Sequence, residues 1–241
     1  MGRDFPFPIR GDNVNGVPPR GSIPFVATDQ TAWIFDEFRY ISPNQSTGVF
    51  SDMYETANGT VDGGGGLGTI QLDSNSAVAG ESGTFGTESG FEFTTPTEWW
   101  MKQRVNLEGP ISDQMIALGA FTNQPSGQTT RASLLTAINN GIGFIFNSTD
   151  SPNWFAFTVE AGASTLVDTG IPAGTGKVNL EMIMKTRGTD TIFYYLNNEV
   201  VAEITTNIPN SQFFMLAGTW NKTTASSILI VDMWELQVNR F

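Results

Sequence analysis

Alternating hydrophobic and polar residues between positions 177 and 205 predict three consecutive antiparallel strands. Val178, Leu180, Met182 and Met184 are spaced two apart, so they share one face of an extended strand. The residues between them are mostly polar and take the opposite face. One side of this strand is therefore expected to face a core and the other side to face solvent.

Two turns divide this stretch into strands. Residues 187–190 form the first turn, in which a glycine supplies conformational freedom. Residues 192–196 are mostly β-branched or aromatic, as strands prefer. Asn197 and Asn198 then predict a tight hairpin, because Asn tolerates the left-handed backbone that two-residue turns need. Residues 200–204 form the returning strand.

Similar short apolar segments, separated by turn residues, recur along the chain. They predict strands at 32–42, 48–56, 98–107, 114–121, 134–138, 142–146, 154–159, 164–167, 213–220 and 228–238. Residues 139–141 and 161–162 are predicted hairpin turns. The glycine-rich region 59–90 is either a long surface excursion or a set of short strands such as 67–73 and 90–95. No segment predicts an amphipathic helix, so the pattern indicates an all-β sandwich or barrel.

Composition narrows the classes of partner. Twelve basic and 24 acidic residues give a net charge of −12, which disfavours nucleic acid and anionic membranes. No apolar run is long enough for a membrane span, and the N-terminus lacks the apolar core of a signal peptide, so we expect no Sec export. The chain has no Cys and no His, which removes disulfides and the commonest general base.

The first 25 residues have a different composition. They contain five prolines and four glycines, which predicts an extended arm ahead of a single β-sandwich domain at residues 26–241. Three arginines against two aspartates give the arm a net charge of +1, which leaves −13 for the rest. The alternatives are a frayed terminus or an arm that binds a neighbouring subunit. The residues that would make the contacts are Arg3, Phe5, Phe7, Ile9, Arg10 and Arg20.

Four segments resemble a known family. Residues 153–157, 167–171, 177–205 and 230–234 are similar to the concanavalin A-like (laminin-G-like) jelly roll, in particular to versions in tailed-bacteriophage structural proteins. The resemblance covers residues 32–241. It implies two antiparallel sheets of six or seven strands, in which the first and last strands, 32–42 and 227–238, are neighbours.

We consider three functions for this chain: a structural protein, a binding module and an enzyme. The resemblance implies a virion structural protein of a tailed phage, assembled in the host cytoplasm: a capsid decoration or head-fibre protein, or a small tail component. Its partners would be the major capsid protein or its own copies, in a homo-oligomer. The alternatives are a carbohydrate-binding receptor module, which would bind a cell-surface glycan, and a polysaccharide-cleaving enzyme. Function does not follow from fold, so the sites are considered separately.

Motifs for catalysis, cofactors and metals are weak. Gly63, Gly65 and Gly68 match a dinucleotide-binding pattern, but residues 69–72 predict a strand where that motif requires a helix. Residues 73–84 begin like a calcium loop but lack its glycine and its closing glutamate. We therefore expect neither cofactor nor metal, although one sequence leaves a calcium site open.

The acidic residues do not form a catalytic pattern. Some jelly-roll hydrolases carry E-x-D-x-x-E on one strand, and this string is absent. Glu88 and Glu92 would lie about 13 Å apart in a strand, beyond the roughly 5–9.5 Å of glycosidase carboxylate pairs. Carboxylates on neighbouring strands could still meet, but the sequence predicts no catalytic residues.

Tryptophans are the main candidates for binding. Trp99 and Trp100 are adjacent, so in a strand one must point inward and the other outward. Trp220 lies at a predicted strand end. These three are candidate glycan-binding or interface aromatics, since aromatic residues are also enriched at protein interfaces. Trp33, Trp154 and Trp234 lie in apolar alternation and are predicted to be in the core.

Overall fold

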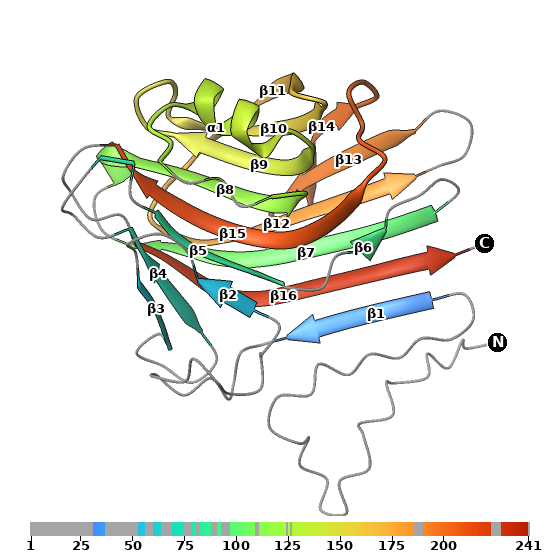
Figure 1. Ribbon diagram of the computed structural model, residues 1–241, viewed down its shortest axis with the longest axis horizontal. Helices are drawn as coiled ribbons and strands as arrows, with labels where there is room; N and C mark the ends of the chain where they lie inside the picture. The colour runs from blue at the N-terminus through green and yellow to red at the C-terminus, as the bar shows by residue number, and fades with distance from the viewer. Residues whose placement is uncertain are drawn as a thin grey trace, which may run out of the picture.

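Two antiparallel sheets face each other in a sandwich (Figure 1). The computed structural model describes residues 31–36, 53–55, 60–63, 69–74, 79–80, 82–87, 91–92, 97–108, 111–123, 125, 127–185, 190–222 and 228–240. Each sheet has eight strands, rather than the six or seven expected, and the all-β prediction is confirmed.

Sheet A contains both terminal strands of the described chain. Its order is β14-β13-β12-β7-β16-β4-β3, and β1 also pairs with β16. The strands are β1 (Thr31–Asp36), β3 (Thr60–Gly63), β4 (Ile70–Asp73), β7 (Thr97–Glu108), β12 (Gly176–Lys185), β13 (Thr191–Leu196), β14 (Glu199–Ile204) and β16 (Ile228–Arg240). The pairing of Ile34 with Leu236 confirms that the first and last strands are neighbours.

Sheet B has the order β11-β10-β9-β8-β15-β5-β2, and β6 also pairs with β15. Its strands are β2 (Met53–Glu55), β5 (Ser82–Thr87), β6 (Phe91–Glu92), β8 (Gln114–Phe121), β9 (Gly141–Asn147), β10 (Asn153–Glu160), β11 (Ala163–Pro172) and β15 (Gln212–Asn221). A short 3-10 helix, η1 (Ile111–Asp113), precedes β8.

Two of the predicted hairpin turns are present, whereas the one predicted at residues 139–141 is wrong, because this segment joins an α-helix, and not a strand, to β9. Asn197 and Asn198 have φ of 51° and 70°, the left-handed backbone that a tight turn between β13 and β14 needs. Ala161 and Gly162, at 47° and 81°, join β10 to β11. Residues 186–189, which include most of the other predicted turn, lie outside the described residues.

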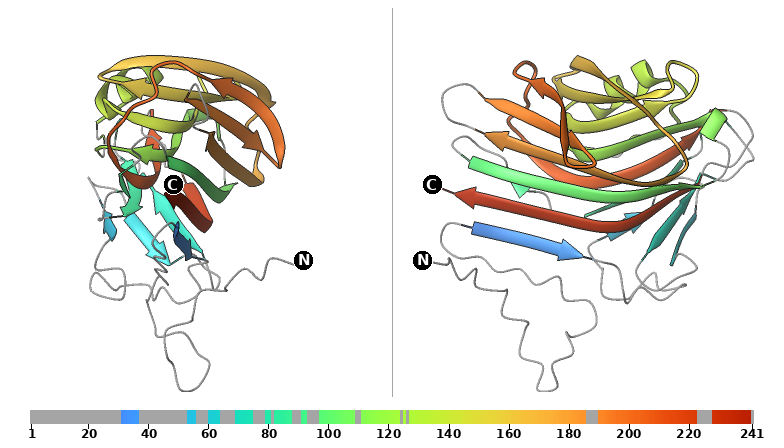
Figure 2. Two further views of the ribbon diagram at one scale, coloured as in Figure 1. Left: turned by 90° about the vertical axis from the view of Figure 1, so that its right-hand side faces the viewer. Right: turned by 180° about the vertical axis from the view of Figure 1, so that it is seen from behind.

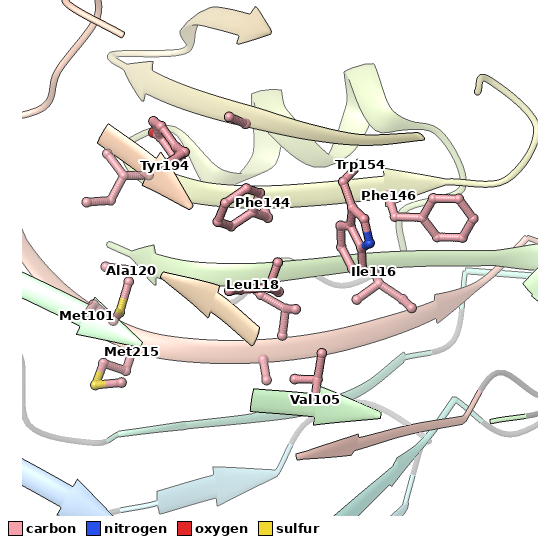
Figure 3. Packing of buried hydrophobic residues seen from close by; sticks show 14 of the residues in the cluster. Met101, Val105, Ile116, Leu118, Ala120, Phe144, Phe146, Trp154, Tyr194 and Met215 are labelled. Atoms are coloured by element: carbon pink, nitrogen blue, oxygen red, sulfur yellow. The ribbon is translucent and has the colours of Figure 1, made fainter. Parts of the chain in front are cut away.

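The main core lies between the sheets (Figure 3). Phe144 of β9 and Tyr194 of β13 meet edge to face, with ring centroids 5.3 Å apart. The Tyr194 hydroxyl donates a 2.6 Å hydrogen bond to the carbonyl oxygen of Phe157, which links the two sheets. Burial raises the pKa of Tyr194 well above its ordinary value, so this hydroxyl keeps its proton.

The prediction of a strand at residues 134–138 is wrong, because this segment is the helix α1 (Arg131–Ile138). Thr130 caps it: the Thr130 hydroxyl accepts from the Ser133 amide at 3.1 Å, and the Ser133 hydroxyl accepts from the Thr130 amide at 3.3 Å. Leu134, Leu135 and Ile138 are buried, as one helical face requires. An apolar run this short fits either element by periodicity alone.

Helix α1 covers the outer face of sheet B and closes a second core there (Figure 1). The residues of this core are Met115, Ala117, Phe121, Leu134, Leu135, Ile138, Ile145, Phe157, Val159, Leu216 and Trp220. Strands β8 and β9 are consequently buried on both faces. Within the described part of the chain, no helix has the length and hydrophobicity to cross a membrane.

Candidate functional site

The outer faces of the two sheets differ in what covers them. Sheet B is covered by α1, whereas none of the described elements lies over the outer face of sheet A (Figure 2). Along β7, Met101, Gln103 and Val105 are buried, while Lys102 and Arg104 are partly exposed. We call this outer surface of β7, β12, β13, β14 and β16 the open face.

Aromatic side chains lie on the open face. Trp100 of β7 is partly exposed and pairs in register with Ile183 of β12, which pairs with Phe193 of β13. Phe193 and Tyr195 are also partly exposed. Trp100 and Phe193 are separated by one strand, so their backbones lie about 10 Å apart. These three rings form a broad apolar area on a surface that solvent can reach.

A charged group lies on the same face. Asp232 of β16 accepts a 2.6 Å hydrogen bond from Arg104 Nε and a 3.2 Å hydrogen bond from Lys177 Nζ. Burial alone would raise the pKa of Asp232, but the hydrogen bonds and positive charges of Arg104 and Lys177 outweigh it and hold that pKa below its ordinary value. This carboxylate is therefore ionised at neutral pH.

The open face thus combines stacking surfaces with hydrogen-bonding groups. Lys102 and Arg104 follow Trp100 at the next two outward positions of β7, and Asn106 comes after them. Tyr195 shares a row with Lys102, through Glu181 of the strand between them. Aromatic rings can stack on a ligand, and the side chains of Lys102, Arg104 and Asn106 can form hydrogen bonds with it.

A second polar cluster lies where β9 and β15 end. Lys222 Nζ donates to Asn147 Oδ1 at 2.6 Å and also to Thr149 Oγ1. Asn147 Nδ2 in turn donates to Asp150 Oδ2 at 2.9 Å. Burial lowers the pKa of Lys222, and the nearby carboxylates of Asp150 and Asp113 oppose that change. This cluster ties the turn at 148–152 to the end of β15, which is a structural role.

Arg131 extends this cluster onto sheet B. Its guanidinium lies 4.0 Å from the centroid of the Phe155 ring, and its Nε lies 3.5 Å from Asp150 Oδ2. The Phe155 ring is therefore covered by a cation. A ligand would have to displace Arg131 to stack there, so the open face of sheet A is the better candidate.

The tryptophan predictions have mixed outcomes. Trp99 is buried and Trp100 is partly exposed, which confirms that they point to opposite sides. Trp154 is buried, as predicted for the core. Trp220, the candidate at a strand end, is fully buried, and its Nε1 donates a 3.2 Å hydrogen bond to the Pro125 carbonyl, so it cannot contact a glycan or a partner. Of the three candidates, Trp100 alone reaches the surface. The side chains of Trp33 and Trp234 lie outside the described residues.

Most of the other residues considered in the sequence lie outside the described part of the chain. All the predicted arm residues, Arg3, Phe5, Phe7, Ile9, Arg10 and Arg20, lie outside the described residues, as does Glu88. Glu92 is in β6, and the structure does not describe its side chain.

Strand β4 begins at Ile70, so the segment after Gly68 is a strand, as predicted, and not the helix of a dinucleotide site. Among the described residues, no group of three or more His, Cys, Asp or Glu could hold a metal.

Phe193 and Tyr195 were not singled out from the sequence. The segment TIFYYL was interpreted as a strand, and its alternation leaves Ile192, Tyr194 and Leu196 inward. The two other aromatic residues must then point outward. The missing information was that none of the described elements covers the outer face of sheet A.

Comparison with known proteins identifies the fold. No protein-family model matches the sequence, and no curated protein matches it. Lectin I from Ulex europaeus, solved with the methyl glycoside of α-L-fucose, has a TM-score of 0.60 at 13% identity over 87% of this chain and 98% of that chain. The Emp47p carbohydrate recognition domain has a TM-score of 0.58 at 11% identity, covering 90% of this chain and 97% of that chain.

The structural neighbours include enzymes as well as lectins. Bacillus licheniformis β-glucanase has a TM-score of 0.54 at 11% identity, over 85% of this chain and 97% of that chain. At these identities the likeness establishes the fold alone. This chain has the concanavalin A-like jelly-roll fold.

Proposed function

We propose that this protein is a non-catalytic carbohydrate-binding protein that holds a glycan on the open face of sheet A. The observation that carries this proposal is the presence of Trp100, Phe193 and Tyr195 on a face that no described element covers. Pyranose rings present apolar C–H faces that stack on aromatic rings. Lys102 and Arg104, in the neighbouring rows, supply hydrogen-bond donors for sugar hydroxyls.

Lectins with this fold support the proposal, since two of the neighbours named above are a sugar-bound lectin and a carbohydrate recognition domain. The absence of a catalytic role is also part of the proposal. The chain has no His or Cys, and the carboxylate of Asp232 is paired with two cations. A lowered pKa makes Asp232 a poor general acid at neutral pH.

A glycan array followed by calorimetric titration tests this function. We expect Trp100→Ala and Tyr195→Ala each to weaken binding of the best glycan at least about tenfold, which is about 1.4 kcal/mol. The control is Thr136→Ala, since Thr136 is exposed on α1 on the opposite side of the molecule. No binding of any array glycan by the wild-type protein, or unchanged affinity in both aromatic variants, would reject the proposal. Release of reducing sugar from a bound polysaccharide would reject its non-catalytic part.

The sequence favours a second candidate, a structural protein of a tailed-phage virion, such as a decoration or head-fibre protein attached by its N-terminal arm. It rests on the resemblance of residues 32–241 and on the proline-rich arm, because the neighbours named above are lectin domains and a glucanase. Mass spectrometry of density-purified particles from the source culture tests it. We expect the chain at a fixed stoichiometry to the major capsid protein, and its absence from particles would reject this role.

A further inference from the structure

Exposed apolar side chains concentrate on two neighbouring edge strands. Among the described residues, the exposed large hydrophobic side chains are Leu166 and Ile171 of β11, each 37% exposed, and Val200 of β14, 57% exposed. Strand β11 is the last strand of sheet B and β14 is the last strand of sheet A. The two edges lie side by side (Figure 1), and the hydroxyl oxygens of Thr165 and Thr206 are 2.7 Å apart between them.

Strand β11 is the less protected of these edges. Among the described strands it pairs with β10 alone, so its other side offers backbone donors and acceptors to a further strand. Proteins usually guard such an edge with charges, and β14 carries Glu199 and Glu203 within six residues. Strand β11 has ten residues and one charge, Asp168, whose Oδ1 already accepts from Asn153 Nδ2 and from the Gly170 amide.

The N-terminal sequence has the pattern of a strand that suits this edge. In an extended chain, the backbone groups of alternate residues point to the same side. Pro6 and Pro8 therefore remove donors from one side, while Phe5, Phe7 and Ile9 keep theirs on the other. This arrangement matches an edge strand whose prolines face solvent. The side chains of the same three apolar residues would share one face of the enlarged sheet.

The charges of the N-terminal arm and of the β11 edge favour a contact between these two segments. Glu160, at the end of β10, and Asp168 of β11 are exposed, as are Glu199 and Glu203 on the adjacent edge. The arm carries Arg3 and Arg10 on either side of its apolar segment, and its net charge is +1 in a chain of −12. The basic arm and the acidic edge are complementary.

We propose that residues 4–10 of one copy add as an extra strand to β11 of a second copy, with Phe5 and Phe7 packed beside Leu166. A second copy is the expected donor, because β1 lies at the opposite margin of the molecule from β11 (Figure 1). Pro18, Pro19 and Pro24, which lie in sequence between this segment and β1, would favour an extended arm and so oppose its return around its own globule. This proposal does not depend on glycan binding.

The test uses the full chain and two complementary variants, Phe5→Ala/Phe7→Ala in the arm and Leu166→Glu in the edge. Sedimentation equilibrium at up to about 100 µM measures self-association. We expect the wild-type protein to self-associate and each variant to be at least about tenfold weaker. A mixture of the two variants should recover association, because an intact arm and an intact edge then meet on different copies. The matched control, Thr136→Glu on α1, should associate like the wild-type protein.

Hydrogen exchange at residues 163–168 gives an independent readout that does not require the edge variant to fold. We expect amides on the free side of β11 to exchange at least about tenfold faster in the arm variant than in the wild-type protein. The proposal is overturned by a monomeric wild-type protein, by an arm variant that associates normally, or by variants that do not complement each other. Protection of β11 in a monomer would indicate that each arm binds its own chain, which also overturns it.

Discussion

Asp232 illustrates how one buried charge connects two strands of the open face. Its carboxylate is 12% exposed and bridges Arg104 of β7 and Lys177 of β12. Lys177 is 68% exposed, so solvent screens its contribution strongly and Arg104 is the more important partner. Without the carboxylate, two cations would face each other across the sheet.

We predict that Asp232→Asn lowers the free energy of unfolding by about 1–2 kcal/mol at pH 7. The pKa of Asp232 is lowered in the folded protein, so its stabilising contribution is complete above the pKa of an unfolded aspartate, about 3.9. It is lost as the pH falls through the folded pKa. Urea denaturation of both proteins at pH 7 and near pH 3 should therefore show a difference that shrinks in acid.

The exposed residue Glu199 provides the control for this experiment. Glu199→Gln should change stability little at either pH, because surface charges contribute little. If Asp232→Asn lowers the free energy of unfolding by the same amount near pH 3 as at pH 7, then the shape of the side chain, and not its charge, accounts for the loss of stability.

At the same scale, sequence alternation predicted that Trp99 and Trp100 point to opposite sides, because that follows from strand geometry alone. Alternation did not predict the burial of Trp220, which depends on α1 and on the carbonyl of Pro125, 95 positions away. The residues around Trp220 do not indicate which distant segments of the chain cover its side chain. Predictions of exposure therefore fail where a helix from a distant part of the chain covers a sheet.

Among the elements, β8 and β9 approach each other unusually closely. Gly119 and Gly143 are direct partners in their register, and a Cβ at Gly143 would overlap the carbonyl oxygen of Leu118. Strand β8 is also paired with β15 and strand β9 with β10, so neither can move sideways in the sheet to make room. The two glycines permit the close approach.

We predict that Gly143→Ala costs about 2–3 kcal/mol of unfolding free energy, because an added methyl group would force the backbones apart. Gly174→Ala is the matched control, since a Cβ there would meet nothing within 4 Å. It should change stability by no more than about 0.5 kcal/mol. Equal stabilities of the two variants in urea titrations would show that the strands separate easily.

Sequence predicted hairpins better than it predicted the helix. Asn197 and Asn198 specify their turn by their own backbone preference, so the β13–β14 hairpin needed no tertiary information. The helix α1 is only eight residues long, and its apolar segment resembles a strand. Its signal was the capping pair Thr130 and Ser133, a weaker form of the usual capping box with Glu.

At the scale of the whole molecule, the C-terminal strand β16 joins two parts of sheet A. Strand β16 pairs with β7 along its length on one side, and with β4 and then β1 on the other. It is therefore an interior strand, although it ends the described chain. Leu229, Val231 and Leu236 of β16 are buried in the main core.

We predict that deleting residues 227–241 abolishes soluble expression. The deletion would split sheet A, expose the edge of β7 and remove three buried side chains from the core, and a long unpaired edge promotes aggregation. Deleting residues 1–25 is the control, since sequence predicts that this arm lies outside the sandwich, and that variant should stay soluble with cooperative thermal unfolding. The measurement is the soluble fraction after expression, followed by circular dichroism during heating. A soluble C-terminal truncation that unfolds cooperatively would mean that β7 and β1 can close the sheet without β16, which contradicts the pairing described here.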